Sequence, residues 1–478
     1  MGRDDTTLDP ESLRADRVSA PATRPALVLL FSREEPHRAG EVLFPPRGKE
    51  AEPQVLGRGG ARPDDPHPRG GWLRQRPGEN EPTPPLSSAA ISRVQLVLRP
   101  HADGVAVQSV GRRAMRVDGL ETTRAVMREG SSLVLEDELV LALTRRPVAL
   151  PPARAWPARL AVPFGRADAF GMVGESPACW ALRDELAFAA ERDLHVLLHG
   201  PTGSGKELAA RTIHALSGLD DAMIARNAAT IPSGLVDAEL FGNVKDYPNP
   251  GMKERDGLVG AADGSTLFLD EIGELPEEQQ AHLLRVLDRG EYQRLGEERS
   301  RTSRFRLLGA TNRPLDRLKH DLLARLTLRI ELPSLDDRPE DVPLIARHLL
   351  LEASAEDAKL ADQFVEERDG ERHVRVAPEL VEALCRAGFE HGVRELSAVL
   401  WRCIQKSTGP WIALAPDVEA ELARHAEPAV DASEVGPDAI RAALEAHDWV
   451  VSRAYKALGL KNRHVLNRLM KKHGITRE

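Results

Sequence analysis

The stretch HVLLHGPTGSGKELAARTIH, residues 195–214, joins an apolar run to an amphipathic run through a short glycine-rich turn. The apolar run predicts a buried strand, and the residues from Lys206 onward predict a helix. Glycines allow the connecting loop to fold so tightly that several main-chain N–H groups surround one phosphate. Lys206 adds a positive charge there, and the helix N-terminus adds its dipole. Strand, loop and helix in this order predict a parallel α/β sheet with a triphosphate site at Gly200, Pro201, Thr202, Gly203, Ser204, Gly205, Lys206 and Glu207.

A second apolar run, TLFLDE at residues 266–271, ends in two carboxylates. Phosphoryl transfer depends mainly on positioning and on neutralisation of charge. We therefore expect Asp270 to bind Mg²⁺ and Glu271 to polarise the attacking water. Glu207 stands where a phosphate loop usually has the Ser or Thr that contacts Mg²⁺. The expected ligands are ATP and Mg²⁺, and the expected reaction is ATP hydrolysis.

Composition limits the class of protein. The chain has 478 residues, of which 41% are hydrophobic and 29% charged, as in folded globular domains. No apolar run approaches the roughly 18 residues that cross a bilayer, and the first residues are too polar for a signal peptide. Three widely spaced cysteines predict a reducing compartment, so we expect a cytoplasmic protein without membrane contact.

The pattern changes along the chain divide it into six parts. Residues 1–23 are expected to be disordered. Short apolar stretches that alternate with polar ones predict a β-sandwich over residues 24–147, with 59–85 as a long irregular loop. Prolines predict an extended linker over 148–170. An α/β unit is expected over 171–335, a helical unit over 336–426, and a compact helical unit over 437–478.

From Gly171 to about Trp401 the chain resembles the AAA+ ATPase domain of bacterial sigma-54-dependent transcriptional activators, the NtrC-like family. GPTGSGKE corresponds to that family's GESGTGKE, which also has the glutamate, and GSTLFLDEIGELP matches it nearly residue for residue. The resemblance implies that residues 336–426 form the helical lid. It also implies that Asn227 holds the catalytic glutamate, that Asn312 is the sensor residue of a strand end, and that Arg394 is the sensor arginine of the lid.

The family's arginine fingers are matched in part by LKHDLLARL, residues 318–326. Arg325 is retained, whereas Lys319 replaces the first arginine and loses the planar fork that binds two phosphate oxygens. Because such fingers act on the ATP of a neighbouring subunit, the resemblance implies a ring, a hexamer in this family. A surface salt bridge is the alternative role for Arg325.

The loop that defines the family differs in this chain. Where the family has GAFTGA, whose Phe-Thr tip contacts the sigma-54 factor, residues 246–251 read DYPNPG. Two prolines exclude a helix there and predict an ordered loop or a break. Three interpretations follow: the ATPase drives a target other than sigma-54, it contacts sigma-54 through a changed surface such as Tyr247, or the loop is a rigid crossover without a partner.

The C-terminal unit resembles the Fis-type helix-turn-helix, with Gly459 at the turn. On a chain of net charge −9, its basic residues form a local electrostatic footprint for DNA. A solvated helical face is the alternative. The residues expected at base edges or phosphates are Asn462, Arg463, His464, Asn467, Arg468, Lys471 and Lys472.

The N-terminal sandwich resembles a forkhead-associated (FHA) domain, a reader of phosphothreonine peptides. Arg58, Ser92 and Arg93 match that family's phosphate-binding residues. Gln95 replaces a bracing histidine, and Ala114 stands at about the place of the asparagine that selects the peptide. Arg112 and Arg113 are candidates to compensate for that loss. The alternative is a sandwich that only docks on the ATPase.

The sequence thus predicts an ATP-hydrolysing transcriptional regulator with three domains: β-sandwich, AAA+ ATPase with helical lid, and helix-turn-helix. The expected partners are upstream activating sites on DNA, RNA polymerase holoenzyme and a phosphothreonine protein. The alternative is an ATP-controlled DNA- and phosphoprotein-binding switch that does not engage sigma-54.

Overall fold

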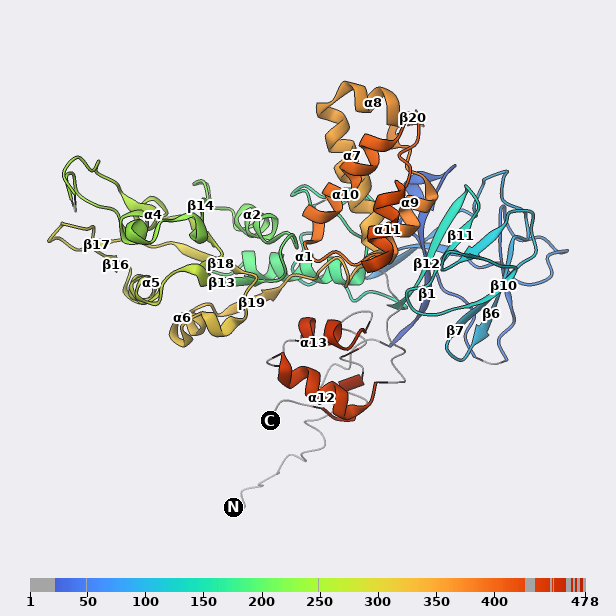
Figure 1. Ribbon diagram of the computed structural model, residues 1–478, viewed down its shortest axis with the longest axis horizontal. Helices are drawn as coiled ribbons and strands as arrows, with labels where there is room; N and C mark the ends of the chain where they lie inside the picture. The colour runs from blue at the N-terminus through green and yellow to red at the C-terminus, as the bar shows by residue number, and fades with distance from the viewer. Residues whose placement is uncertain are drawn as a thin grey trace, which may run out of the picture.

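The computed structural model describes residues 22–425 except 49, 161, 248 and 369, then 435–447, 449 and 451–460, and beyond these only 466, 469, 470 and 473–475. Residues 1–23, which the sequence predicts to be disordered, lie almost entirely outside the described residues. The β-rich part and the α/β part lie toward opposite ends of the long axis, and the helices α7–α11 lie between them (Figure 1).

The N-terminal part consists of two packed sheets, which confirms the predicted β-rich region. An eight-stranded sheet has the order β5-β4-β2-β1-β12-β11-β8-β9, and a four-stranded sheet has the order β10-β7-β6-β3. The strands are β1 Thr23–Ser32, β2 Val42–Leu43, β3 Gln54–Leu56, β4 Trp72–Arg76, β5 Glu79–Thr83, β6 Leu96–His101, β7 Gly104–Ser109, β8 Met115–Val117, β9 Leu120–Glu121, β10 Arg124–Met127, β11 Ser132–Leu135 and β12 Leu139–Pro147.

The prediction of an irregular loop over residues 59–85 is wrong for its second half, which forms the hairpin β4–β5. Gly78, with φ +76°, makes the turn between these strands. Trp72 is buried, and buried Gln75 donates a hydrogen bond from Nε2 to the carbonyl of Pro147 at 2.9 Å. The hairpin escapes a pattern search because β5 is polar throughout and β4 buries only two of its five residues.

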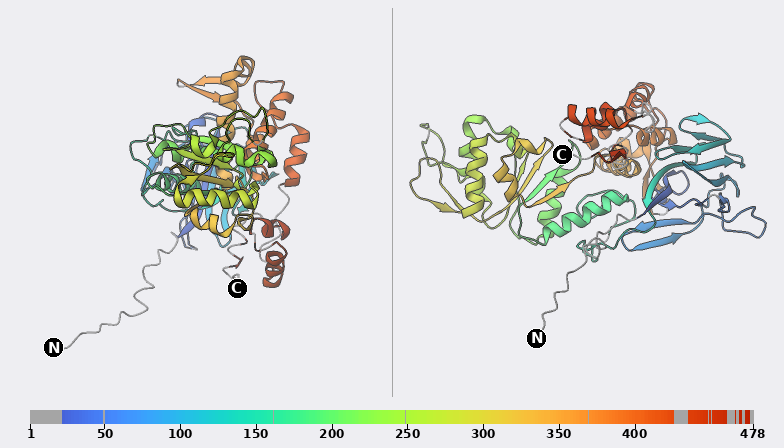
Figure 2. Two further views of the ribbon diagram at one scale, coloured as in Figure 1. Left: turned by 90° about the vertical axis from the view of Figure 1, so that its left-hand side faces the viewer. Right: turned by 90° about the horizontal axis from the view of Figure 1, so that it is seen from below.

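The α/β part has a five-stranded parallel sheet in the order β14-β15-β18-β13-β19, as the alternation of strands and helices predicts. Helices α1 and α2 cover one face, and α3 to α6 cover the other. Figure 2 shows these layers from two further directions. The elements are α1 Pro177–Ala190, β13 Val196–His199, α2 Lys206–Leu216, β14 Ile224–Asn227, α3 Val236–Phe241, α4 Gly257–Ala261, β15 Thr266–Asp270, α5 Glu277–Arg289, β16 Glu291–Tyr292, β17 Arg301–Thr302, β18 Arg306–Thr311, α6 His320–Arg325 and β19 Leu328–Glu331.

The following part is helical as expected, with one hairpin, β20–β21, that helical periodicity did not predict. We call α7 to α11 with this hairpin the lid. Its elements are α7 Val342–Glu356, α8 Ala358–Phe364, β20 Val365–Arg368, β21 Glu371–Val374, α9 Pro378–Arg386, α10 Gly392–Lys406 and α11 Pro416–His425, and the C-terminal unit contributes α12 Pro437–Ala446 and α13 Val451–Ala457. Short 3₁₀ helices occur at Pro36–Arg38, Ala228–Thr230, Ser233–Leu235, Ile272–Glu274, Leu315–Arg317 and Pro339–Asp341.

The central strands of the sandwich are apolar on both faces. In β1, Leu27 and Leu29 point into the sandwich core, whereas Val28 and Leu30 belong to a core shared with α7 and α9 of the lid. Polar contacts border this shared core: Ser132 Oγ donates to Glu382 Oε1 at 2.8 Å. The sandwich therefore docks on the lid.

Replacing Val28 by Asp should test this shared core, because Val28 is 1% exposed and lies among the apolar side chains that the sandwich and the lid share. We expect the free energy of unfolding to fall by about 3–5 kcal/mol, as for an uncompensated buried charge. Urea denaturation followed by tryptophan fluorescence measures it. Val110→Asp is the matched control, since Val110 is 48% exposed and surface changes cost about 0.5 kcal/mol or less. Equal losses in both variants would contradict the shared core.

Candidate active site

The phosphate loop lies between the end of β13 and the start of α2, as the sequence predicts. Gly203 and Gly205 have φ of +72° and +96°, which side chains other than glycine rarely adopt. The first turn of α2 leaves N–H groups without intrahelical acceptors. The hydroxyl of Ser204 is buried and has no hydrogen-bond partner among the residues that the structure describes. The loop therefore offers unpaired donors at a helix N-terminus, which is how proteins bind phosphate.

Lys206, at the first position of α2, points back into this loop. Its Nζ donates to the carbonyls of Gly200 at 3.0 Å and Pro201 at 3.1 Å. Burial lowers the pKa of Lys206, and the negative charges of Glu271 and Asp270 oppose that shift. The cation is thus held between the phosphate loop and the two carboxylates.

The two carboxylates stand at the carboxyl end of β15. Glu271 has φ +50°, a strained conformation that is common at functional sites. Asn227 Nδ2 donates to Asp270 Oδ2 at 3.3 Å, so the contact with Glu271 that the family resemblance implies is not the one found here. Asn312 instead contacts Glu271: its main-chain N–H donates to Oε2 at 3.4 Å. Its side chain donates to Thr202 Oγ1 at 3.0 Å and so joins the loop to the carboxylate.

Most of these groups line one cleft of about 670 Å³. The predicted residues that line it are Thr202, Gly203, Ser204, Gly205, Lys206, Glu207, Asn227, Asp270, Glu271 and Arg394. Its apolar lining was not predicted, because it comes from segments that lie far apart in the sequence and share no motif. This lining consists of Phe170, Met172, Val173, Leu182, Leu332, Ile345 and Leu349.

The lid touches the phosphate loop directly. Val393 N–H, at the start of α10, donates to the carbonyl of Gly203 at 3.1 Å. A Cβ on Gly203 would stand 2.1 Å from the carbonyl oxygen of His391, so only glycine fits there. Arg394 follows Val393 and faces the cleft. Movement of the lid therefore changes the surroundings of the phosphate loop.

The donor set fits Mg²⁺ that arrives with a triphosphate. Mg²⁺ is usually bound by one or two carboxylates together with phosphate oxygens, and Asp270 and Glu271 supply the carboxylates beside the loop. Within the described ranges, no group of three or more His, Cys, Asp or Glu side chains could hold a metal ion by itself.

Arg325 lies on α6, outside the residues that line the cleft. Its Nε is 2.5 Å from Asp288 Oδ1 in a surface ion pair, the alternative role that the sequence allows. Lys319 Nζ is 4.0 Å from Glu277. Neither Lys319 nor Arg325 is among the described residues that line the cleft of this chain.

The described residues of the loop 242–257, which leave out 248, are held by hydrogen bonds and ion pairs. Asn243 is buried, and its Nδ2 donates to the carbonyls of Val244 and Lys253, both at 2.9 Å. Arg294, from the β16–β17 connection, pairs with Glu254 at 2.8 Å and with Asp256. Tyr247 is 45% exposed at the loop's tip. It packs against Gly296, where an added Cβ would approach Tyr247 Cγ to 2.6 Å.

The predicted phosphopeptide residues gather at one end of the sandwich. The Arg58 side chain is exposed, and the main-chain N–H of Arg58 donates a hydrogen bond to the carbonyl of Ser92 at 3.2 Å. Arg93 donates to the carbonyl of Gly60 at 3.0 Å and lies 3.8 Å from Asp65. The hydrogen bond from Arg69 is the main cause that lowers the pKa of Asp65 to about 2.

Gln95 braces this end of the sandwich in place of the family's histidine. It is buried, and its Nε2 donates to the carbonyl of Arg113 at 3.0 Å, while its Oε1 accepts from Ser92 N–H at 3.3 Å. The amide thus ties together the two loops that carry Ser92 and Arg113.

All predicted DNA-contacting residues, Asn462, Arg463, His464, Asn467, Arg468, Lys471 and Lys472, lie outside the described residues. No helix in the described part of the chain has the length and apolar character needed to cross a membrane.

Comparisons with known proteins follow the same division of the chain. Residues 172–334 match the family described as "Sigma-54 interaction domain". The transcriptional regulatory protein ZraR of Salmonella typhimurium is 34% identical over 324 residues, which cover 64% of this chain and 70% of ZraR. The formate hydrogenlyase transcriptional activator of the same species is 33% identical over 322 residues, covering 64% of this chain and 45% of that protein.

Among solved structures, the chain is similar to NtrX from Brucella abortus in complex with ADP. The TM-score is 0.46 at 25% identity, over 64% of this chain and 70% of NtrX. The sequence relatives decide the assignment: this chain is an AAA+ ATPase and belongs to the family of sigma-54-dependent transcriptional activators.

Proposed function

We propose that ATP binds in the cleft between the phosphate loop and the lid, and that Glu271 activates the water that hydrolyses it. The convergence of Lys206 and Glu271 on one cleft, with Asn312 hydrogen-bonded to Glu271 and Thr202 of its lining, carries this proposal. Mg²⁺ held by Asp270 would neutralise charge on the phosphate oxygens. The loop amides and Ser204 bind phosphate, Arg394 approaches from the lid, and the apolar lining takes the base.

Arg325 acts on a neighbouring subunit in this proposal, and the working form is a ring, a hexamer as in the family. Its distance from its own cleft and its exposure on α6 support this role. The ion pair with Asp288 is exposed and therefore weak, so exchanging it for a phosphate contact costs little.

The ring is tethered to upstream DNA sites by the C-terminal unit and acts in the cytoplasm on RNA polymerase holoenzyme. The FHA-like sandwich receives a phosphothreonine protein through Arg58, Ser92 and Arg93. Arg58 supports this role because it is exposed beside Ser92. Arg93 is partly neutralised by Asp65, so a bound phosphate has to compete with that carboxylate.

A second candidate function is a DNA- and phosphoprotein-binding switch that does not engage sigma-54. The loop 242–257 favours it, because DYPNPG replaces the family's contact residues, Tyr247 of that stretch packs on Gly296, and the flanking Glu254 pairs with Arg294. The leading proposal instead assigns Tyr247, exposed at the loop's tip, as the residue that contacts the factor.

Replacing Glu271 by Gln should lower the kcat of ATP hydrolysis by about 100-fold or more, because the carboxylate that polarises water is lost. ATP binding should remain, since Lys206 and the loop amides are unchanged. Phosphate release and fluorescence titration with labelled ATP measure the two quantities. Glu274→Gln, three residues along and paired with Arg313, is the control and should keep wild-type turnover. Normal turnover in Glu271→Gln would refute the assigned base.

Replacing Arg325 by Ala should lower kcat by about 10³-fold or more, the usual worth of an arginine finger. Mixing Arg325→Ala with Glu271→Gln should restore part of the activity. At some interfaces an intact finger of one variant then meets an intact carboxylate of the other. A finger that acts within its own chain predicts no such rescue, so an inactive mixture would exclude the action in trans.

The two candidate functions differ in open-complex formation by sigma-54 RNA polymerase. We expect the protein with ATP to stimulate melting of a promoter that carries its binding sites. Tyr247→Ala should abolish this stimulation and leave the ATPase rate unchanged, whereas Lys253→Ala should preserve both. The second function would be favoured by a different result: the native chain hydrolyses ATP but does not stimulate melting. Grafting GAFTGA into residues 246–251 would then have to produce the stimulation.

A further inference from the structure

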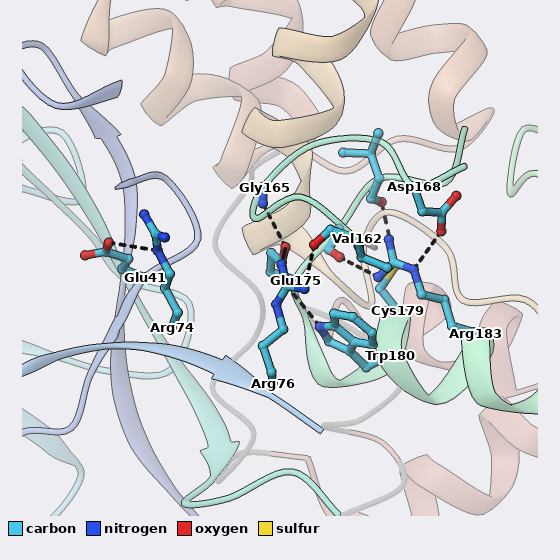
Figure 3. Close-up of polar contacts among 12 residues, drawn as sticks. Glu41, Arg74, Arg76, Val162, Gly165, Asp168, Glu175, Cys179, Trp180 and Arg183 are labelled. Carbon is cyan, nitrogen blue, oxygen red and sulfur yellow. Dashed lines mark hydrogen bonds and ion pairs between the residues drawn. The ribbon is translucent and has the colours of Figure 1, made fainter. Parts of the chain in front are cut away.

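The apolar side of the cleft is formed partly by residues 170–173, a short segment between the sandwich and α1. Polar contacts hold its main chain. Asp168 accepts hydrogen bonds from the N–H groups of Phe170 and Met172, both at 3.0 Å. Arg183, on α1, donates to the carbonyls of Met172 at 3.0 Å and Gly174 at 2.8 Å. Its Nε also donates to Asp168 Oδ2 at 2.9 Å (Figure 3). A shift of this segment therefore changes the shape of the base side of the cleft.

Glu175 ends this segment and is buried among three donors. Its carboxylate accepts from Gly165 N–H at 2.7 Å, from Trp180 Nε1 at 3.1 Å and from Arg76 at 3.1 Å. Figure 3 shows the four groups meeting at one point. Burial raises the pKa of Glu175. Among the groups that lower the pKa of Glu175, the charge of Arg76 is the largest.

Arg76 belongs to the sandwich, at the end of β4. Besides Glu175 it contacts the carbonyl of Val162 at 2.6 Å, and its guanidinium lies 5.1 Å from the ring centre of Trp180. A second sandwich residue, Arg146 of β12, is fully buried and donates to the carbonyl of Glu175. Two guanidinium groups of the sandwich thus hold the side chain and the main chain of the residue that ends the cleft wall.

We propose that Arg76 and Glu175 are positioning residues for the nucleotide: through them the sandwich fixes residues 170–173, the base-side wall of the ATP site. The sandwich is then a structural part of the nucleotide site as well as a receiver of signals. This inference rests on the proposed ATP site at the phosphate loop.

Replacing Arg76 by Gln in the full-length protein tests the inference. We expect KM and the Kd for ATP with Mg²⁺ to rise on the order of tenfold, within the usual range of coupling between sites. The value of kcat at saturating ATP should stay within about twofold, because Asp270 and Glu271 stand on β15 and not on this wall. Arg76→Lys keeps the charge and should restore part of the affinity. It also serves as the informative variant if Arg76→Gln does not fold.

Arg38→Gln is the matched control. Arg38 is a buried sandwich arginine whose side chain pairs with Glu35 and Glu41 inside the sandwich only. We expect it to lower the thermal unfolding temperature and to leave KM unchanged. An equal KM for wild type, Arg76→Gln and Arg76→Lys would overturn the inference, as would a loss confined to kcat.

The variant Lys206→Ala tests the proposed ATP site independently of the positioning role of Arg76 and Glu175. We expect this variant to lose binding of labelled ATP. Unchanged binding would refute the ATP site itself. Lost binding in Lys206→Ala together with wild-type KM in both Arg76 variants would refute only the positioning role of the sandwich.

Discussion

Burial of β1, β11 and β12 on both faces is the constraint on which the arrangement of the chain depends. One face closes the sandwich core, and the other closes the core of the lid. Each buried Val or Leu side chain contributes about 1.5–3 kcal/mol. A few such side chains on the lid face therefore contribute as much as the roughly 5–15 kcal/mol that stabilises a whole domain. The sandwich and the lid cannot separate without exposing this surface, so they are expected to move together.

The sandwich and the lid, packed together, contact both sides of the nucleotide cleft. On the phosphate side, α10 of the lid contacts the phosphate loop through Val393 and Gly203. On the base side, Arg76 and Arg146 of the sandwich contact Glu175, which follows the cleft wall. The α/β sheet supplies the carboxylates and Lys206 from between these two contacts. A change in the angle between sheet and lid would thus alter both ends of the site at once.

Local chemistry explains which parts of the site the sequence could predict. The phosphate loop, Asp270 and Glu271 are short motifs, so one stretch of chain carries all their information. The apolar wall is different, because Phe170, Leu332 and Leu349 meet only after the lid has folded over the sheet. The contact of Asn227 with Asp270 depends on the register between β14 and β15, which no motif specifies.

The fold follows the same rule. Helices and parallel strands with strong periodicity were predicted, whereas the hairpins β4–β5 and β20–β21 were missed, because their residues are mostly polar and partly exposed. Apolar runs such as ALVLL differ from the strict alternation of a strand that is buried on one face only. Adjacent apolar residues in a strand indicate burial on two faces, and here the second face belongs to the lid.

Strand β4 connects the proposed phosphopeptide site of the sandwich with the residues that contact the wall of the nucleotide cleft. The loop that carries Arg58 and Asp65 runs straight into β4, and β4 ends at Arg76. A strand rises about 3.3 Å per residue, so these five residues join the two places over a distance of roughly 15 Å. A phosphate that displaces Asp65 from Arg69 and Arg93 would change the loop at the start of this strand. Strand β4 pairs with β5 from Trp72 to Arg76 and with β2 at Trp72 and Leu73, so one paired strand joins the loop to Arg76. The missed hairpin therefore joins the loop of Arg58 and Asp65 to the sandwich's contact with Glu175.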